Sequence, residues 1–249
     1  ARQVALGVGF YIDPISSSIA FLCAFLMTGA FLFSWNYFKS IKTYFHALML
    51  IFMAGMIGLA FTADLFTFFV FFELMSVASF ALTAYKAEEP SALEGGVNFT
   101  ITNSVGAFMI LIGISLLYGR TGALNMAQIG ESLQQKAADP LVITSLALIV
   151  SGLLIKAAII PFHFWLVDAH AVAPTPVCLL FSGIMVSLGL YGVMRIYTTI
   201  FAPAMGPRSH DFAALMLSLG ALTAVLGAVL SLVQRHIKRM LASSTISHM

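Results

Sequence analysis

The sequence has few charged residues for its length. Only 9% of its 249 residues are Asp, Glu, Lys or Arg, and 60% are apolar. Soluble domains average about 25% charged and about 45–50% apolar residues. The mean hydropathy of +0.99 points the same way. The composition excludes a soluble domain, a disordered chain, a coiled coil and a collagen, and it predicts a multi-pass membrane protein.

The sequence also lacks motifs for metal centres, nucleotide binding and nucleic-acid binding. Cys23 and Cys178 show no CxxC spacing, so a metal centre or a disulfide framework has no support. No glycine-rich phosphate-binding motif opens a helix, and a formal charge of +2 supplies no basic patch, so neither a nucleotide cofactor nor a nucleic-acid partner is expected. Residues 1–11 do not resemble a signal peptide. The sequence begins without Met and stops at Met249 in a helix-like run, which suggests part of a longer protein.

Seven stretches are long and apolar enough to cross a bilayer as helices, and none alternates with the period of two that a barrel requires. They cover residues 12–34, 44–62, 64–85, 97–119, 141–162, 177–201 and 211–234. This pattern predicts an all-α, polytopic membrane protein in one transmembrane domain, residues 1–249. The connections are expected to be short and polar, the longest being residues 120–140.

The loop charges predict the orientation of the chain. One side carries six basic residues and the other carries four, which places residues 235–239 in the cytoplasm. The first group is Lys39, Lys42, Lys86, Arg235, Lys238 and Arg239, and the second is Arg2, Arg120, Lys136 and Arg208.

Two charged residues lie well inside apolar stretches. Glu73 occurs in FFVFFELMS, and Lys156 occurs in SGLLIKAAIIPFHFW. A charge at the bilayer centre costs about 2.5–3.5 kcal/mol on insertion scales, so such residues usually face a partner or water and serve a function. The alternative is a side chain that reaches to the interface, which suits a long lysine better than a short glutamate.

Pro161 predicts a break in the fifth segment. It has no N–H, so the carbonyl of Ala157 loses its helical partner one residue after Lys156. Broken helices beside ionisable groups hold ions at mid-depth in transporters. A kink repaired by neighbouring hydroxyls is the alternative.

Several other polar residues are candidates for a proton relay. Ser187, Tyr191 and Arg195 follow one another at intervals of four and share a helix face. His163, His170 and His248 lie near segment ends, and histidine titrates near neutrality. Hydrogen bonds between helices explain such residues equally well.

Five stretches of the sequence match a known family in the same order: YIDPISS, ADLFTFFVFFELMS, LLYGRTGALNMAQIG, KAAIIPFHFWLVDAHAVAPTPV and IKRMLASSTISHM. Through these stretches, residues 11–249 resemble the antiporter-like membrane subunits of respiratory complex I, a family shared with Mrp cation/proton antiporters and energy-converting membrane-bound hydrogenases. The resemblance implies about fourteen helices in two inverted five-helix repeats, each with a broken helix. Residues 44–201 would form the first repeat, and residues 211–249 would begin the second.

The same resemblance implies roles for single residues. Glu73 matches the family's glutamate and Lys156 the lysine of its broken helix, which form a switching ion pair that loads protons. His170 matches a position near the cytoplasmic access path, and Lys238 is a further relay candidate. This chain reads MVSLGLYG where the family usually has MVKxGxYG, so Ser187 replaces a lateral lysine and puts full pumping in doubt.

Four functions remain open. The first is a proton-translocating subunit of a respiratory redox complex, either a complex I-like NADH-quinone oxidoreductase or a membrane-bound hydrogenase. It would itself hold no redox cofactor and would pack against similar membrane subunits. The second is an Mrp-type Na⁺/H⁺ antiporter subunit. The third is a seven-helix receptor, and the fourth is a structural subunit that has lost transport. The expected location is a bacterial or archaeal cell membrane or an organelle inner membrane.

Overall fold

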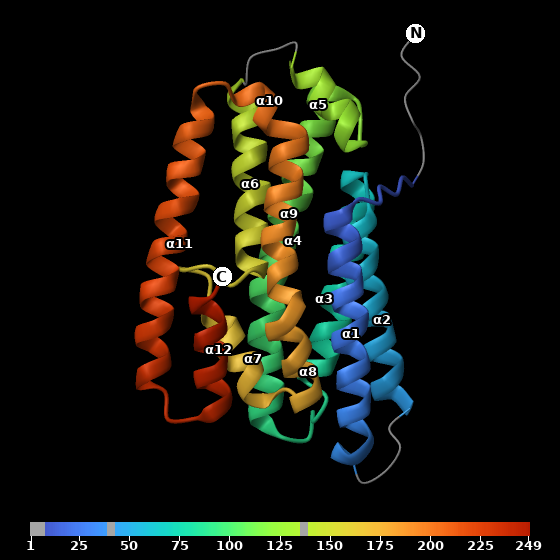
Figure 1. The fold of residues 1–249 in the computed structure, drawn as a ribbon, viewed down its shortest axis with the longest axis vertical. Helices are drawn as coiled ribbons and strands as arrows, with labels where there is room; N and C mark the ends of the chain where they lie inside the picture. The colour runs from blue at the N-terminus through green and yellow to red at the C-terminus, as the bar shows by residue number, and fades with distance from the viewer. Residues whose placement is uncertain (1–7, 39–42, 135–138) are drawn as a thin grey trace.

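A computed structural model describes residues 8–38, 43–134 and 139–249, which form a bundle of helices running up and down one axis (Figure 1). The predicted all-α fold is confirmed. Four of the basic residues in the orientation count lie outside the described ranges: Arg2, Lys39, Lys42 and Lys136.

The helices are α1 Pro14–Tyr37, α2 Thr43–Phe61, α3 Leu65–Thr83, α4 Pro90–Thr121, α5 Met126–Gln134, α6 Pro140–Lys156, α7 Phe164–Val172, α8 Thr175–Leu180, α9 Val186–Ile196, α10 Ala202–Met205, α11 Arg208–Val233 and α12 Ile237–Ser247, with π-helical turns η1 Phe181–Met185 and η2 Tyr197–Phe201.

All seven predicted membrane segments have a counterpart in the structure. In the described part of the chain, six helices are long and apolar enough to span a membrane, one of them the continuous run Thr175–Met205 from α8 to α10. The fifth segment is the shorter helix α6, which α7 follows after a break.

Aspartates begin three of the helices. Asp13 accepts a hydrogen bond from the Ser16 N–H at 2.7 Å, and Asp64 does the same for Thr67 at 2.7 Å. Asp139 accepts from the Val142 N–H at 2.9 Å. Each carboxylate satisfies an N–H that the first helical turn leaves without a partner, which is why these helices start where they do.

The break lies between α6 and α7 at mid-height of the bundle (Figure 1). Helix α6 ends at Lys156, so the predicted extension of this segment to residue 162 was wrong. Ala158 has φ +53°, a left-handed conformation that costs a residue with a Cβ about 1–2 kcal/mol. The Trp165 indole N–H donates to the Ile155 carbonyl at 2.8 Å and braces the break from α7.

The predicted polar connection at residues 120–140 contains a short helix, α5, which the sequence analysis did not predict. Met126, Ile129 and Leu133 recur at helical spacing and are buried. These residues give a nine-residue helix one apolar face to pack on the bundle, and the count of membrane-length segments did not detect it.

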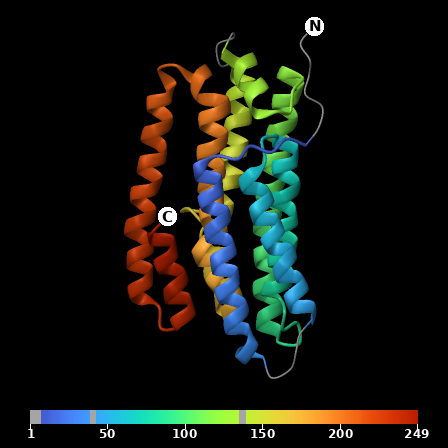
Figure 2. The same ribbon diagram turned by 45° about the vertical axis from the view of Figure 1, so that its right-hand side comes forward.

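Helices pack closely against each other at the centre of the bundle and at one of its edges. At the centre, a Cβ at Gly152 of α6 would collide with the Gly106 carbonyl of α4, and the Ser145 hydroxyl donates to the Gly113 carbonyl at 2.7 Å. Small residues let membrane helices approach this closely. At the edge, α11 and α12 pack against each other and stand beside the other helices in both views (Figures 1 and 2).

Candidate functional site

Lys156 is fully buried at the end of α6. Its ammonium donates to the Ser76 hydroxyl of α3 at 3.0 Å. Three aromatic rings surround it, with Nζ at 5.3 Å from the Phe72 centroid, 6.0 Å from Phe80 and 5.5 Å from Phe99. Aromatic faces attract a cation without hydrogen-bonding it, so Ser76 is the hydrogen-bonding contact in an otherwise apolar enclosure.

Glu73 lies one helical turn before Ser76 on α3 and is partly buried. Residues three apart on a helix share a face, so Glu73 and Ser76 both lie on the side that contacts Lys156. Within the described residues, no ion pair of 4.0 Å or less joins Glu73 to Lys156. The Ser76 hydroxyl also donates to the Phe72 carbonyl at 2.7 Å, so it accepts from the lysine and donates to its own helix.

Three of the predicted relay residues line one cavity of about 510 Å³: His170, Lys238 and His248. The cavity lies between α7, η1 and α12. Nδ1 of His170 is 3.0 Å from the Leu166 carbonyl, and Nε2 is 2.8 Å from the Ser182 hydroxyl. Lys238 donates to the Ala173 carbonyl at the end of α7 at 2.8 Å. The tertiary structure thus brings together residues up to 78 positions apart in the sequence.

Aromatic rings lie between this cavity and the lysine. The His170 ring is 5.8 Å from Phe181, and Phe181 is 5.7 Å from Phe99. Phe99 is also one of the rings around the Lys156 ammonium, and it stacks on Trp165 at 4.5 Å. Aromatic side chains therefore separate the cavity from Lys156 in this conformation.

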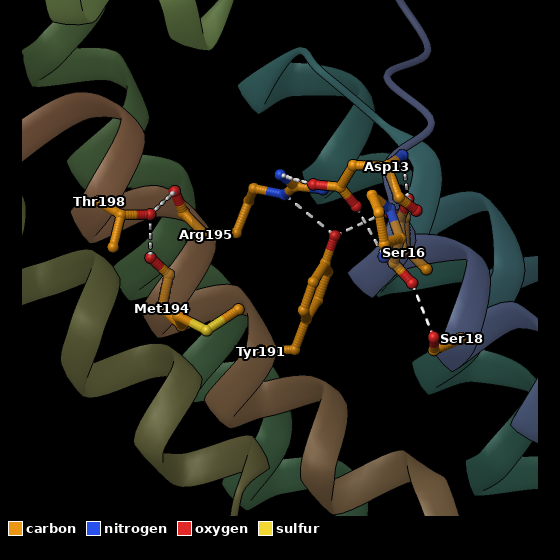
Figure 3. Close-up of polar contacts among 9 residues, drawn as sticks. Asp13, Ser16, Ser18, Tyr191, Met194, Arg195 and Thr198 are labelled. Atoms are coloured by element: carbon orange, nitrogen blue, oxygen red, sulfur yellow. Dashed lines mark hydrogen bonds and ion pairs between the residues drawn. The ribbon is translucent and has the colours of Figure 1, made fainter.

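Tyr191 belongs to a different cluster, near the start of α1 (Figure 3). Its hydroxyl donates to the Ala60 carbonyl at 2.7 Å and accepts from Arg195 Nε at 3.0 Å. Arg195 Nη1 pairs with Asp13 Oδ2 at 2.7 Å. The Arg195 guanidinium, together with the Ser16 N–H, lowers the pKa of Asp13 to about 2. Tyr191 thus serves an ion pair that joins α9 to α1.

A second cavity of about 510 Å³ lies beside this ion pair. Its lining includes Tyr11, Asp13 and Arg195. The Arg195 guanidinium carbon is 5.3 Å from the Tyr11 ring centroid. Ser187 is partly buried four residues before Tyr191, so the predicted shared face of α9 runs from Ser187 to the Asp13–Arg195 pair.

The two remaining candidates lie at the helix break. Pro161 follows a cis peptide bond from Ile160. His163 is 8% exposed, and its ring centroid is 4.1 Å from that of Phe164. Its Nδ1 is buried and has no hydrogen-bond partner among the residues that the structure describes. The structure does not place His163 among the residues lining the His170 cavity.

Sequence reasoning missed Ser76, Asp13 and Thr223. Ser76 follows Glu73 by one helical turn, so a search for hydroxyls on the glutamate's face would have found it. Asp13 stands in the quoted YIDPISS stretch, immediately before a proline, where an N-cap is common. Thr223 carried no signal, because it is one of many small residues in α11. In the described part of the chain, no group of three His, Cys, Asp or Glu could hold a metal ion.

The fold and this site define a class: a polytopic membrane protein in which a broken helix places a buried lysine against a neighbouring helix that carries one glutamate within its apolar stretch. A sequence model of the family described as "NADH:quinone oxidoreductase/Mrp antiporter, TM" matches residues 62–249, and the chain belongs to this family.

Relatives and solved structures agree with this membership. The chain is 33% identical over 247 residues to the NADH-quinone oxidoreductase subunit N of Desulforudis audaxviator, which covers 97% of this chain and 48% of that protein. It superposes with a TM-score of 0.86 on a chain of the membrane-bound sulfane sulfur reductase, an archaeal respiratory membrane complex, at 29% identity over 99% of this chain and 50% of that one. It superposes on a chain of the Mrp complex from Dietzia sp. DQ12-45-1b with a TM-score of 0.87, at 25% identity over 99% of this chain and 45% of that one. The chain spans about half the length of the curated relatives it matches.

Proposed function

We propose that this chain translocates protons as a membrane subunit of a respiratory redox complex of the NADH-quinone oxidoreductase type. The observation that carries the proposal is the fully buried Lys156 ammonium at a helix break, with Ser76 as its hydrogen-bond acceptor and Glu73 one turn away. A buried ammonium is costly unless it is paired, so a lysine in this position suits a group that changes its charge during work.

The proposed step is a change in the distance between Glu73 and Lys156. An opposite charge nearby favours the ionised form of a lysine, and an apolar enclosure disfavours it. When the carboxylate approaches, Lys156 takes up a proton, and when it withdraws, the burial of the ammonium away from solvent favours release. Ser76 lies one helical turn beyond Glu73 on α3 and offers the ammonium a neutral acceptor when the carboxylate is withdrawn.

The proposed access path starts at the cavity lined by His170, Lys238 and His248. We assign His170 as the relay between this cavity and Lys156, because the rings of Phe181 and Phe99 form a continuous set of contacts from His170 to the ammonium. The path is closed in this conformation, and opening it requires these rings to move so that water can enter. The break at Pro161 supplies the non-helical backbone beside the lysine.

The repeat assignment supports the same proposal. Residues 44–201 fit a first five-helix repeat, because α2, α3, α4, the pair α6–α7 and the run α8–α10 give five crossings with one broken helix. Residues 211–249 fit the start of a second repeat. Ser187 cannot hold a charge where the family usually has a lysine, so we expect transfer from Lys156 toward the second repeat to depend on water or on a residue outside this chain.

The second candidate is a subunit of an Mrp-type Na⁺/H⁺ antiporter. The high structural similarity to a chain of an Mrp complex favours it. This function needs no electron donor, so a transport assay separates the two candidates. In both, the partners are other membrane subunits and the transported ions include protons.

The test is proton uptake by the assembled complex in sealed vesicles, started with NADH and measured with and without sodium. We expect Lys156→Ala and Glu73→Gln to lower the number of protons taken up per NADH oxidised. Lys86→Ala and Glu94→Gln are the matched controls, because both residues are exposed and outside the site. Unchanged uptake in Lys156→Ala contradicts the proposal, and sodium-driven proton exchange without NADH favours the antiporter.

A further inference from the structure

Helix α11 contributes few residues to the interior of the described structure. Only Thr223 and Gly227 are buried among its 26 residues. Gly227 faces α12, where a Cβ would collide with Ser247. Thr223 instead faces the break between α6 and α7, so the two buried positions of this helix serve two different contacts.

The Thr223 hydroxyl makes two hydrogen bonds. It accepts from the Ile160 N–H of the break at 3.2 Å, and it donates to the Leu219 carbonyl of its own helix at 2.6 Å. A hydroxyl has one proton to donate and can accept at the same time. Thr223 thereby links the helix break to α11 across 63 sequence positions.

The Ile160 N–H needs such a partner. Ile160 is 6% exposed and lies where the helix is interrupted, four residues after Lys156. In a bilayer every backbone polar group must be satisfied within the protein, and an unsatisfied group costs several kcal/mol. The Thr223 hydroxyl satisfies this N–H from outside the broken helix.

We propose that Thr223 is a positioning residue, which fixes the backbone after Lys156 and so makes the placement of the lysine depend on α11. The inference rests on the proton-transfer role of Lys156 given above. A displacement of α11 breaks the hydrogen bond to Ile160 and frees the break to move, which shifts Lys156 relative to Ser76. Helix α11 thereby acts on the proton site without contributing a titratable group to it.

The test compares Thr223→Val with Thr223→Ser in the assembled complex, with NADH-driven proton uptake measured per NADH and per assembled complex. Valine keeps the shape of threonine but removes the acceptor, whereas serine keeps the acceptor. We expect valine to lower the Lys156-dependent rate of proton uptake per assembled complex about fivefold, which is the effect of one lost hydrogen bond on a rate, and serine to restore it. Thr144→Val is the matched control, because Thr144 is exposed on α6 and its hydroxyl donates to the Pro140 carbonyl of the same helix.

The outcomes separate this inference from the proposal on which it rests. Loss of uptake in Lys156→Ala with wild-type uptake in Thr223→Val overturns the role of Thr223 alone. Wild-type uptake in Lys156→Ala overturns both. If Thr223→Val does not assemble, Thr223→Cys replaces it, because a thiol is only a weak acceptor. Equal uptake in the cysteine and serine variants then overturns the inference.

Discussion

The Lys156 ammonium donates to the Ser76 hydroxyl at 3.0 Å, and Ser76 lies one helical turn beyond Glu73 on α3. The lysine therefore hydrogen-bonds to a neutral group while a carboxylate lies nearby on the same helix face. A neutral contact holds a proton less firmly than an ion pair does, because hydrogen bonds to charged acceptors are stronger. This arrangement suits a lysine that must both take up and release a proton.

Ser76→Ala removes the hydroxyl that accepts from Lys156. We expect the Lys156-dependent proton uptake to fall about fivefold, the rate equivalent of about 1 kcal/mol. The measurement is NADH-driven uptake in vesicles. Ser79→Ala is the control, because the Ser79 hydroxyl is also buried but donates only to its own helix. Equal uptake in the two variants would show that Ser76 has no part in the transfer.

His170→Leu tests the access path. If protons reach Lys156 through the cavity beside His170, we expect uptake to slow about tenfold, a rise in the barrier of about 1.4 kcal/mol. His163→Leu should have little effect, because His163 does not line that cavity. Ser182→Ala removes the hydrogen bond to His170 and keeps the imidazole, so it measures the positional contribution alone. A larger effect from His163→Leu than from His170→Leu would contradict a proton path through this cavity and would favour one at the break between α6 and α7.

Asp13→Asn tests the link between α1 and α9. Asparagine keeps the N-cap of α1 but loses the charge that pairs with Arg195. We therefore expect the free energy of unfolding to fall by about 1–2 kcal/mol. The pKa of Asp13 is about 2 in the folded chain, below its ordinary value of 3.8. The stabilisation from the pair is therefore present above about pH 4 and is lost as the pH falls toward 2.

Thermal unfolding in detergent at pH 7 and at pH 3 measures this effect. We expect the wild type and Asp13→Asn to differ clearly at pH 7 and less at pH 3. Asp139→Asn is a comparison at another N-cap, where the pair with Arg120 is about one-third exposed and a smaller effect is expected. The same difference at both pH values would mean that the charge of Asp13 does not stabilise the fold.

Gly152→Ala tests the packing of α4 against α6. A Cβ at this position would overlap the Gly106 carbonyl, so the two helices must separate, and we expect a destabilisation of about 1–3 kcal/mol. Gly29→Ala in α1 is the control, because no atom of the described residues lies within 4 Å of its Cβ position. Lower unfolding temperatures for both variants would point to a general effect of alanine and not to this contact.

Much of the fold could be read from the sequence because its signals are local. Aspartates and prolines begin the helices, and apolar stretches of membrane length give the crossings. Pro161 marked the neighbourhood of the break, although the helix ends five residues earlier, at Lys156. Helix α5 was missed because it is too short to count as a crossing and lies in a stretch taken for a polar loop.

The sequence by itself determined that this is a polytopic helical membrane protein with a broken helix and with two charged residues, Glu73 and Lys156, inside apolar stretches. A charge inside an apolar stretch is conspicuous wherever the helix packs. The tertiary structure alone decided which polar groups meet. It pairs Lys156 with Ser76, Asp13 with Arg195, and the backbone N–H of the break with Thr223. Helices that are apolar on every side carry little periodicity to show which face is buried, so only the packed bundle selects these partners.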